Sequence, residues 1–132
     1  MEAKTHLAAD PALFGRVVEL GEGSAEVVLD TTEAMVVDAE GLVHGGFVFG
    51  LADYAAMLAV NDPFVVLGAA QSRFLKPVPV GARVVARARI DSVEGRKHEV
   101  RVAAAVGADI VFEGTFTCFV LERHVLEPVG SK

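Results

Sequence analysis

The sequence has few of the residues that build cross-linked or membrane-spanning proteins. Its 132 residues include one cysteine, Cys118, which excludes an intrachain disulfide framework and a zinc site made of several thiolates. The longest mostly apolar stretch, residues 47–60, is too short to span a bilayer and contains Asp53. The first ten residues carry charges and include no long apolar run. We therefore expect a cytoplasmic protein without a membrane partner or a targeting segment.

Positive charge is scarce as well. The chain has 12 Lys and Arg residues against 18 Asp and Glu, and its net charge of -6 disfavours nucleic acid as a partner. No glycine pattern of the Walker or dinucleotide-binding type is present. His98 and His124 lack the spacing of metal ligands. The sequence thus predicts neither a bound metal nor a separate cofactor.

The residues that are present indicate one folded domain. Hydrophobic residues make up 52% of the chain and charged residues 23%, which is typical of globular proteins. We expect a single domain over residues 1–132, with an N-terminal extension at about 1–13 and a C-terminal tail at about 124–132. Within the extension, Pro11 is expected to interrupt a helical turn at residues 6–13. Apolar alternation predicts strands at residues 15–20, 25–30, 65–74, 84–90, 100–106 and 110–120.

A helix is predicted at residues 47–61, between the second and third of these strands. It follows Gly45 and Gly46, ends before Pro63, and is apolar on nearly every side. Such a helix is stable when buried, and its alanine residues allow a sheet to come close. The sequence therefore predicts an α+β fold, a curved antiparallel sheet wrapped around one long central helix. Exposed edge strands of such a sheet favour edge-to-edge pairing of two copies.

Residues with chemical potential gather around the start of this helix. Gly45 and Gly46 let the backbone approach a ligand, and the first helical turn has free N–H donors that suit a developing oxyanion. Asp53 comes eight residues after Gly45, about 12 Å further along the helix axis. One chain cannot easily place both groups on one carbonyl, which favours a site shared between subunits. Because an unpaired buried carboxylate is costly, catalysis explains Asp53 better than a structural role does.

The segment from residue 44 to residue 53 resembles a family signature. His44, Gly45 and Gly46, followed by four residues, Leu51, one residue and Asp53, match the motif of the phenylacetyl-CoA thioesterase-like branch of hot-dog proteins. A Phe-Leu-x-Pro-x-x-x-Gly stretch at residues 74–81 is similar to the same family, and the resemblance covers roughly residues 15–122. It implies a hot-dog fold and a homo-oligomer, with a dimer and a tetramer both open.

The resemblance also implies roles for individual residues. The residue matching Asp53 is the catalytic carboxylate, either a nucleophile or a general base on water, and it faces the thioester from the partner subunit. The N–H matching Gly45 polarises the thioester oxygen, while His44 and Gly46 shape the site. Many members have an Asn that orients water or substrate where this chain has Asp38, and an acid cannot donate a hydrogen bond as an amide does. Asp38 is a candidate for substrate contact, and a hydrogen bond to its own turn is the alternative.

Further residues are candidates for contact with the substrate. The family often has a hydroxyl near the position of Ser72. Six basic residues are candidates for the phosphates of coenzyme A: Arg73, Lys76, Arg87, Arg89, Arg96 and Lys97. Most are more typical of solvated strand faces, and Arg96 and Lys97 are favoured because they share a turn. Cys118 lies on an apolar stripe and is expected to pack in the core. We expect an apolar acyl pocket lined by Phe47, Phe49, Tyr54 and Met57.

The function indicated is hydrolysis of a small or medium acyl-CoA thioester at a subunit interface. Coenzyme A would be part of the substrate, and a placed carboxylate with charge stabilisation would suffice for the reaction. One alternative is a non-catalytic acyl-CoA or acyl-carrier binding protein of the same fold, which Asp38 makes more credible. Another is a dehydratase or hydratase that uses a histidine and an acid, although the surrounding motif does not match. The acyl chain stays open.

Overall fold

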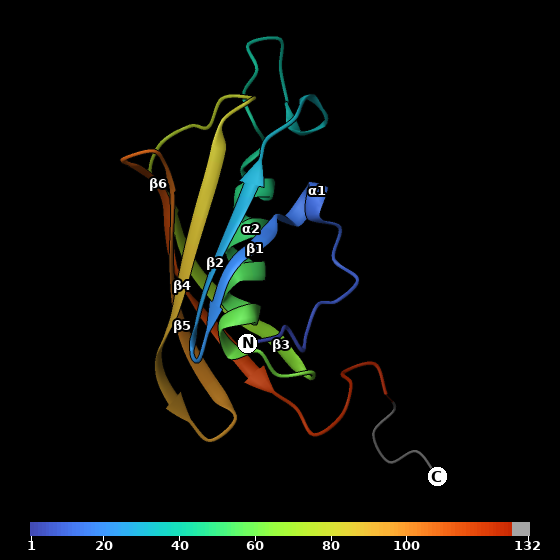
Figure 1. The fold of residues 1–132 in the computed structure, drawn as a ribbon. Coiled ribbons are helices and arrows are strands. Elements are labelled where there is room, and N and C mark those ends of the chain that lie inside the picture. Colours follow the sequence, from blue (N-terminus) through green and yellow to red (C-terminus); the bar gives the residue numbers. More distant parts are fainter. Residues whose placement is uncertain (128–132) are drawn as a thin grey trace.

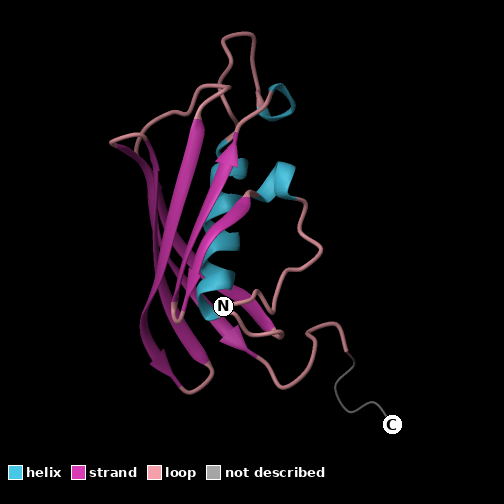
Figure 2. Ribbon diagram, in the orientation of Figure 1, coloured by secondary structure: helices cyan, strands magenta, loops and turns pink. Residues whose placement is uncertain are grey.

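Six β-strands form one antiparallel sheet that curves around a long helix in the computed structural model, which describes residues 1–127 (Figure 1; Figure 2). Neighbouring strands follow the order β1, β2, β4, β5, β6, β3. Their bounds are β1 Arg16–Gly21, β2 Ser24–Asp30, β3 Val65–Phe74, β4 Arg83–Glu94, β5 Lys97–Val106 and β6 Asp109–Val120. This arrangement confirms the expected α+β architecture and all six expected strands.

The connectivity of the sheet is partly local and partly long-range. β1 and β2 form a hairpin, and β4, β5 and β6 form the expected meander. β3 follows the helix and pairs with β6, so that Val65 lies opposite Val120 and Phe74 lies opposite Phe112. Within residues 1–127, β3 has a neighbour on one side only. Its other side is a ten-residue edge with unpaired backbone groups.

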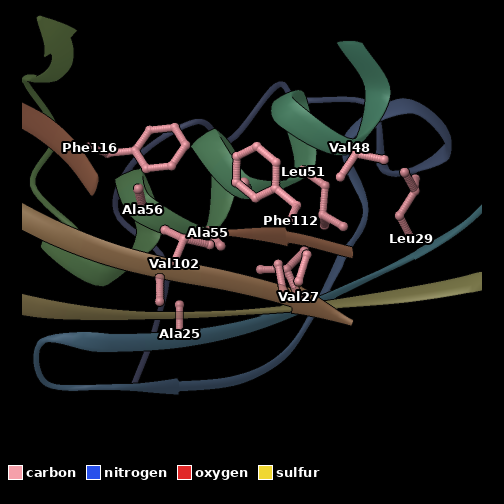
Figure 3. Packing of buried hydrophobic residues seen from close by; sticks show 14 of the residues in the cluster. Ala25, Val27, Leu29, Val48, Leu51, Ala55, Ala56, Val102, Phe112 and Phe116 are labelled. Atoms are coloured by element: carbon pink, nitrogen blue, oxygen red, sulfur yellow. The ribbon is translucent and has the colours of Figure 1, made fainter. Parts of the chain in front are cut away.

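The central helix α2, Gly45–Val60, is fixed by a cap at each end. The Nδ1 atom of His44 accepts the N–H of Gly46 at 2.7 Å, and Asn61 ends the helix in the left-handed region at φ 52°. Figure 3 shows the buried side of α2 packed against the sheet. The small side chains along this side allow the backbones of helix and sheet to lie close together. The buried residues of α2 are Val48, Leu51, Ala52, Ala55, Ala56, Met57, Leu58 and Ala59.

The N-terminal extension differs from the expectation. Pro11 does not interrupt a helical turn but begins helix α1, Pro11–Phe14, whose N-cap Asp10 accepts the N–H of Ala12 at 2.9 Å. Proline suits the first helical position because its missing N–H would have no partner there. The chain before α1 is tied to the end of α2, where the side chain of Asn61 bonds to backbone atoms of residues 2 and 4.

The remaining segments are short. A 3-10 turn, Glu33–Met35, lies in the connection between β2 and α2. No helix in the described part of the chain is long and apolar enough to cross a membrane. Of the expected C-terminal tail, residues 128–132 lie outside the described residues.

Gly15 and Gly81 provide a test of how tightly α1, β2 and α2 meet. Both have positive φ, at 100° and 89°. A Cβ on Gly15 would lie 2.9 Å from Val27 Cγ1 and 3.0 Å from Leu51 Cδ1, whereas a Cβ on Gly81 would meet nothing within 4 Å. Gly81→Ala should lower the free energy of unfolding by about 1–3 kcal/mol through backbone strain alone. Gly15→Ala should cost roughly 1–3 kcal/mol more through overpacking. Urea unfolding monitored by circular dichroism measures both, and equal losses would contradict the packing described.

Candidate functional site

The start of α2 presents one backbone donor without an acceptor. The N–H of Gly46 is taken by the His44 side chain, and that of Phe47 donates to the His44 carbonyl at 3.0 Å. The N–H of Gly45 has no hydrogen-bond partner among residues 1–127. It lies at the positive end of the helix dipole, next to the ring of Phe74, which would be 3.1 Å from a Cβ on Gly45. A donor in this position can polarise a carbonyl oxygen.

His44 has a defined structural role in this arrangement. Its Nδ1 accepts the hydrogen bond from Gly46, so the hydrogen of the neutral ring is on Nε2. A Cβ on Gly46 would lie 2.9 Å from that Nδ1, so glycine is the residue that allows the cap to form. The ring of His44 also meets the ring of Phe47 edge-on, with centroids 6.4 Å apart. The expected shaping role of His44 and Gly46 therefore has a local physical basis.

Asp53 lies two turns further along α2 and is half-buried. Its Oδ1 atom is buried and has no hydrogen-bond partner among the described residues. Burial raises the pKa of this carboxyl to about 6. Phe49, one turn earlier, packs on Phe112 and Phe116, with ring centroids 6.3 and 5.4 Å away. A carboxylate that is poorly solvated and titrates near neutral pH is suited to act as a base or a nucleophile.

Cys118 on β6 lies near this carboxyl group. The thiol is fully buried, and burial, followed by the charges of Asp53 and Glu99, raises its pKa to about 12. A thiol with such a high pKa is protonated at neutral pH and is a poor nucleophile. The expectation that Cys118 packs in the core is therefore confirmed by its burial.

An apolar groove of about 390 Å³ borders the start of α2. Phe47 lines this groove, whereas Phe49 packs against the sheet and Met57 is buried, and the contact of these residues with an acyl group stays a prediction. Tyr54 lies beside the N-terminal segment, with its ring centroid 6.4 Å from that of Phe14. Sequence reasoning did not anticipate the contribution of α1 to the groove. The groove is lined by Leu13, Phe14, His44, Gly46, Phe47 and Gly50.

Asp38 precedes α2 in the chain, and Ser72 follows α2 on β3. The Oδ1 of Asp38 accepts the N–H groups of Glu40 at 3.0 Å and Leu42 at 3.1 Å, and so holds the turn before α2. Ser72 is half-buried on β3, opposite Gly114 of β6. Their contact with a substrate stays a prediction.

Arg96 and Lys97 lie in the β4–β5 hairpin at the other end of the sheet. The carbonyl of Arg96 accepts the N–H of Val120. This part of the hairpin lies next to the segment that follows the C-terminal end of α2. Arg96 is paired with Glu122 at 2.7 Å, and Lys97 with Glu94 at 3.8 Å. Within one chain, Arg96 and Lys97 therefore lie far from residues 44–46. Their binding of phosphate stays a prediction. Among residues 1–127 no cluster of His, Cys, Asp and Glu could hold a metal ion.

Comparison with solved structures places this architecture among known proteins. The crystal structure of an uncharacterized protein from Pyrococcus horikoshii is 53% identical and has a TM-score of 0.95, covering 96% of this chain and 98% of that one. A mutant of the phenylacetic acid degradation protein PaaI from Thermus thermophilus, with asparagine replaced by aspartate, is 33% identical. Its TM-score is 0.76, and the match covers 85% of this chain and 100% of that one.

Two curated relatives are longer proteins. Methylthioribose-1-phosphate isomerase of Aquifex aeolicus (strain VF5) is 50% identical over 123 residues, which are 92% of this chain and 27% of the isomerase. Transcription factor FapR of Shouchella clausii (strain KSM-K16) is 31% identical over 112 residues, or 84% of this chain and 59% of FapR. The chain thus spans about a quarter of one and about three-fifths of the other.

The family is established by a model that covers more than half of the sequence. The model described as "Thioesterase superfamily" matches residues 40–109, from the turn before α2 to the start of β6. The matched segment contains Gly45, Asp53 and the β4–β5 hairpin. Together with the curved sheet around α2, this match means that the chain belongs to the thioesterase superfamily and has the hot-dog fold.

Proposed function

We propose that the protein hydrolyses an acyl-CoA thioester, with Asp53 as the reacting carboxylate. The single observation that carries this proposal is the environment of Asp53, whose Oδ1 is buried without a partner in the described chain. An ionised carboxyl held in this way is destabilising, and no hydrogen bond to Oδ1 from residues 1–127 offsets that cost. A substrate carbonyl and its attacking water would give the group a function that explains its retention. Family membership and the similarity to PaaI support the same chemistry.

The site would be completed by a second copy of the chain. Gly45 and Asp53 are eight residues apart on one helix, about 12 Å along its axis, which is too far for both to act on one thioester carbonyl. The free edge of β3 runs beside α2, with Phe74 against Gly45 at one end. Pairing of two β3 edges would bring two α2 helices to a common interface. Asp53 of the partner subunit would then face the carbonyl that the N–H of Gly45 holds.

The apolar groove beside Gly46 suits the acyl part of the substrate. Apolar side chains from α1 and α2 form its walls. His44 lines the end of the groove that lies at the start of α2. A groove of about 390 Å³ accommodates a small or medium acyl group, including an aromatic one. Gly50 also lines the groove, and a Cβ at this position would lie 3.6 Å from Phe14 Cδ1.

The reaction requires few groups. Water attacks the thioester carbonyl while the Asp53 carboxylate takes its proton, and the negative charge on oxygen is held by the N–H of Gly45. The carbon–sulfur bond then breaks, the proton passes to the leaving thiolate, and the products are a carboxylic acid and free coenzyme A. Direct attack by Asp53, with hydrolysis of the resulting anhydride, yields the same products.

A second candidate function is acyl-CoA binding without hydrolysis. The similarity to transcription factor FapR and the presence of Asp38, whose Oδ1 is engaged by its own turn, favour it. Calorimetry with a CoA ester, run beside an assay for thiol release, separates the two functions. Binding without release would favour the binding protein.

Asp53→Asn should abolish turnover and leave substrate binding in place. Loss of the proton acceptor should lower kcat by at least about 100-fold in a thiol-release assay with acyl-CoA. Asp91→Asn, an exposed change on β4, is the matched control and should keep the parent rate. A rate for Asp53→Asn within a few-fold of the parent would exclude Asp53 as the reacting group.

The same variant has a stability signature that depends on pH. The pKa of Asp53 is raised to about 6 by burial, so the ionised group destabilises the fold above the unfolded value of about 3.9, fully so above pH 6. Asp53→Asn should therefore be more stable than the parent at neutral pH by up to about 3 kcal/mol. The two proteins should be equally stable below about pH 4. Denaturant unfolding at both pH values measures this difference, and a less stable variant at neutral pH would contradict it.

The pH dependence of hydrolysis should report the same carboxyl group. Only the ionised form accepts a proton or attacks, so kcat/KM should rise with pH through about 6 and then level off. A thiol reagent that works in mildly acidic solution allows the rate to be followed across this range. A flat profile, or activity that falls as Asp53 ionises, would contradict the assigned role.

Ala69→Glu tests whether β3 forms the interface. Ala69 is exposed near the middle of the free edge, and copies of a charged residue would meet one another in a paired edge. We expect a smaller mass in light scattering and a large loss of turnover, because each site needs both subunits. Ala39→Glu, in an exposed loop, should change neither. An Ala69→Glu protein of unchanged mass and activity would place the interface elsewhere.

A further inference from the structure

The face of the sheet opposite α2 carries a concentration of arginine residues. Arg87 and Arg89 of β4 and Arg101 of β5 are exposed there, alternating with buried residues that face the helix. Arg73 of β3 lies on the same face, in register with Glu113. This local positive charge is unexpected in a chain with a net charge of -6.

Strand register arranges these residues in two rows with different charge balance. In the balanced row, Arg87 pairs with Glu26 at 3.2 Å and Arg73 with Glu113 at 3.7 Å. In the other row, Arg89 lies directly opposite Arg101, and neither has a carboxylate within 4.0 Å in the described chain. We call this second set the arginine row: Ser24, Arg89, Arg101, Thr115 and Gln71, from β2 across to β3.

The pairing of Arg89 with Arg101 is unfavourable in the protein alone. Like charges directly opposite each other on neighbouring strands destabilise a sheet. The acid two residues before Arg101 is Glu99, whose Oε1 accepts the hydroxyl of Thr117 at 2.7 Å. The neighbours of the arginine pair within its row are two hydroxyls and an amide, which can donate to an anion without competing for the guanidinium groups.

A hollow of about 550 Å³ lies over this region, and its size is that of a small-molecule site. Arg89, Arg101, Gln71 and Thr115 line it, together with residues of the balanced row. Within that row the small side chain of Ala103 lies between Arg87 and Glu113. We propose that the arginine row binds the phosphate groups of a small phosphorylated ligand. Guanidinium groups bind phosphate through paired N–H donors, and a bound anion would relieve the repulsion between Arg89 and Arg101.

The charge of the whole chain argues for a small ligand. A long polyanion such as RNA would meet the acidic remainder of the surface, whereas two or three phosphates fit within the row. The same chemistry has two sources: a free nucleotide, or the adenosine phosphate end of coenzyme A. The second source rests on the function proposed above, and it is compatible with the geometry because Gln71 places the row at the β3 edge.

The test measures binding of adenosine 3′,5′-bisphosphate, ADP, inorganic phosphate and adenosine by calorimetry. The protein should bind the phosphorylated nucleotides and not adenosine. Arg89→Gln combined with Arg101→Gln should weaken nucleotide binding at least about tenfold, because charge-assisted hydrogen bonds are lost. No binding by the unmodified protein at millimolar nucleotide, or equal affinity in the double variant, would overturn the proposal.

Arg83→Gln is the matched control. Arg83 lies on the same face of β4, outside the arginine row, and is paired with Asp30 at 2.8 Å. This variant should bind nucleotide as the parent does, and a loss equal to that of the double variant would overturn the proposal. Thermal unfolding checks that the double variant is folded. Removal of like charges should leave it at least as stable as the parent.

Competition identifies the source of the phosphates. If a non-hydrolysable thioether of acyl-CoA displaces the bisphosphate, the row holds the nucleotide end of the substrate. If both bind together, the row is a separate nucleotide site. Both results support the proposal. Neither measurement requires turnover, so the phosphate-binding proposal and the proposed hydrolysis can fail independently of each other. A double variant that changes oligomeric mass while keeping its nucleotide affinity would instead make this face an interface between copies and overturn the proposal.

Discussion

The carboxyl group of Asp53 is held in the middle of a helix that is packed by apolar atoms on most sides. One of its oxygens is buried and has no donor in the described chain, and its pKa is raised to about 6 by that burial. Any contribution of the ionised group to folding would require a partner that residues 1–127 do not provide for Oδ1. The caps at His44 and Asn61 and the alanines of α2 fix where this group lies. The proposed catalytic role of this group and the proposed site shared between two subunits both depend on that placement.

The sequence predicts the elements of the fold better than their long-range partners. The strands and α2 follow from period and from glycine and proline signals, which act within a few residues. The pairing of β3 with β6 joins residues between 38 and 55 positions apart, from Phe74 with Phe112 to Val65 with Val120, and depends on closure of the sheet around α2. Pro11 begins α1 rather than breaking a helical turn, because it directly follows the Asp10 cap, where its missing N–H needs no partner. The groove wall from Phe14 depends on how the extension folds back, which local patterns do not encode.

The sequence motif points to Gly45 and Asp53 as candidate site residues. The arginine row, in contrast, depends on strand register. The turn pairs Glu94 with Lys97, and counting back from it would place Arg89 opposite Val102, a residue of the buried face. The buried stripes of β4 and β5 cannot both face the helix in that register. An irregularity between Ile90 and Ser92 resolves the conflict and sets Arg89 opposite Arg101. The mismatch is visible in the sequence and could have predicted both the bulge and the pair.

The most direct test of the account is the titration of Asp53 itself. In protein labelled with carbon-13 at aspartate carboxyl groups, the resonance of Asp53 can be assigned by its absence from Asp53→Asn. Its chemical shift as a function of pH reports the pKa in the assembled protein without a substrate. A midpoint near 6 is expected, because burial raises the pKa of this carboxyl. A midpoint near the ordinary aspartate value of about 4 would show a well-solvated carboxylate and contradict the central claim.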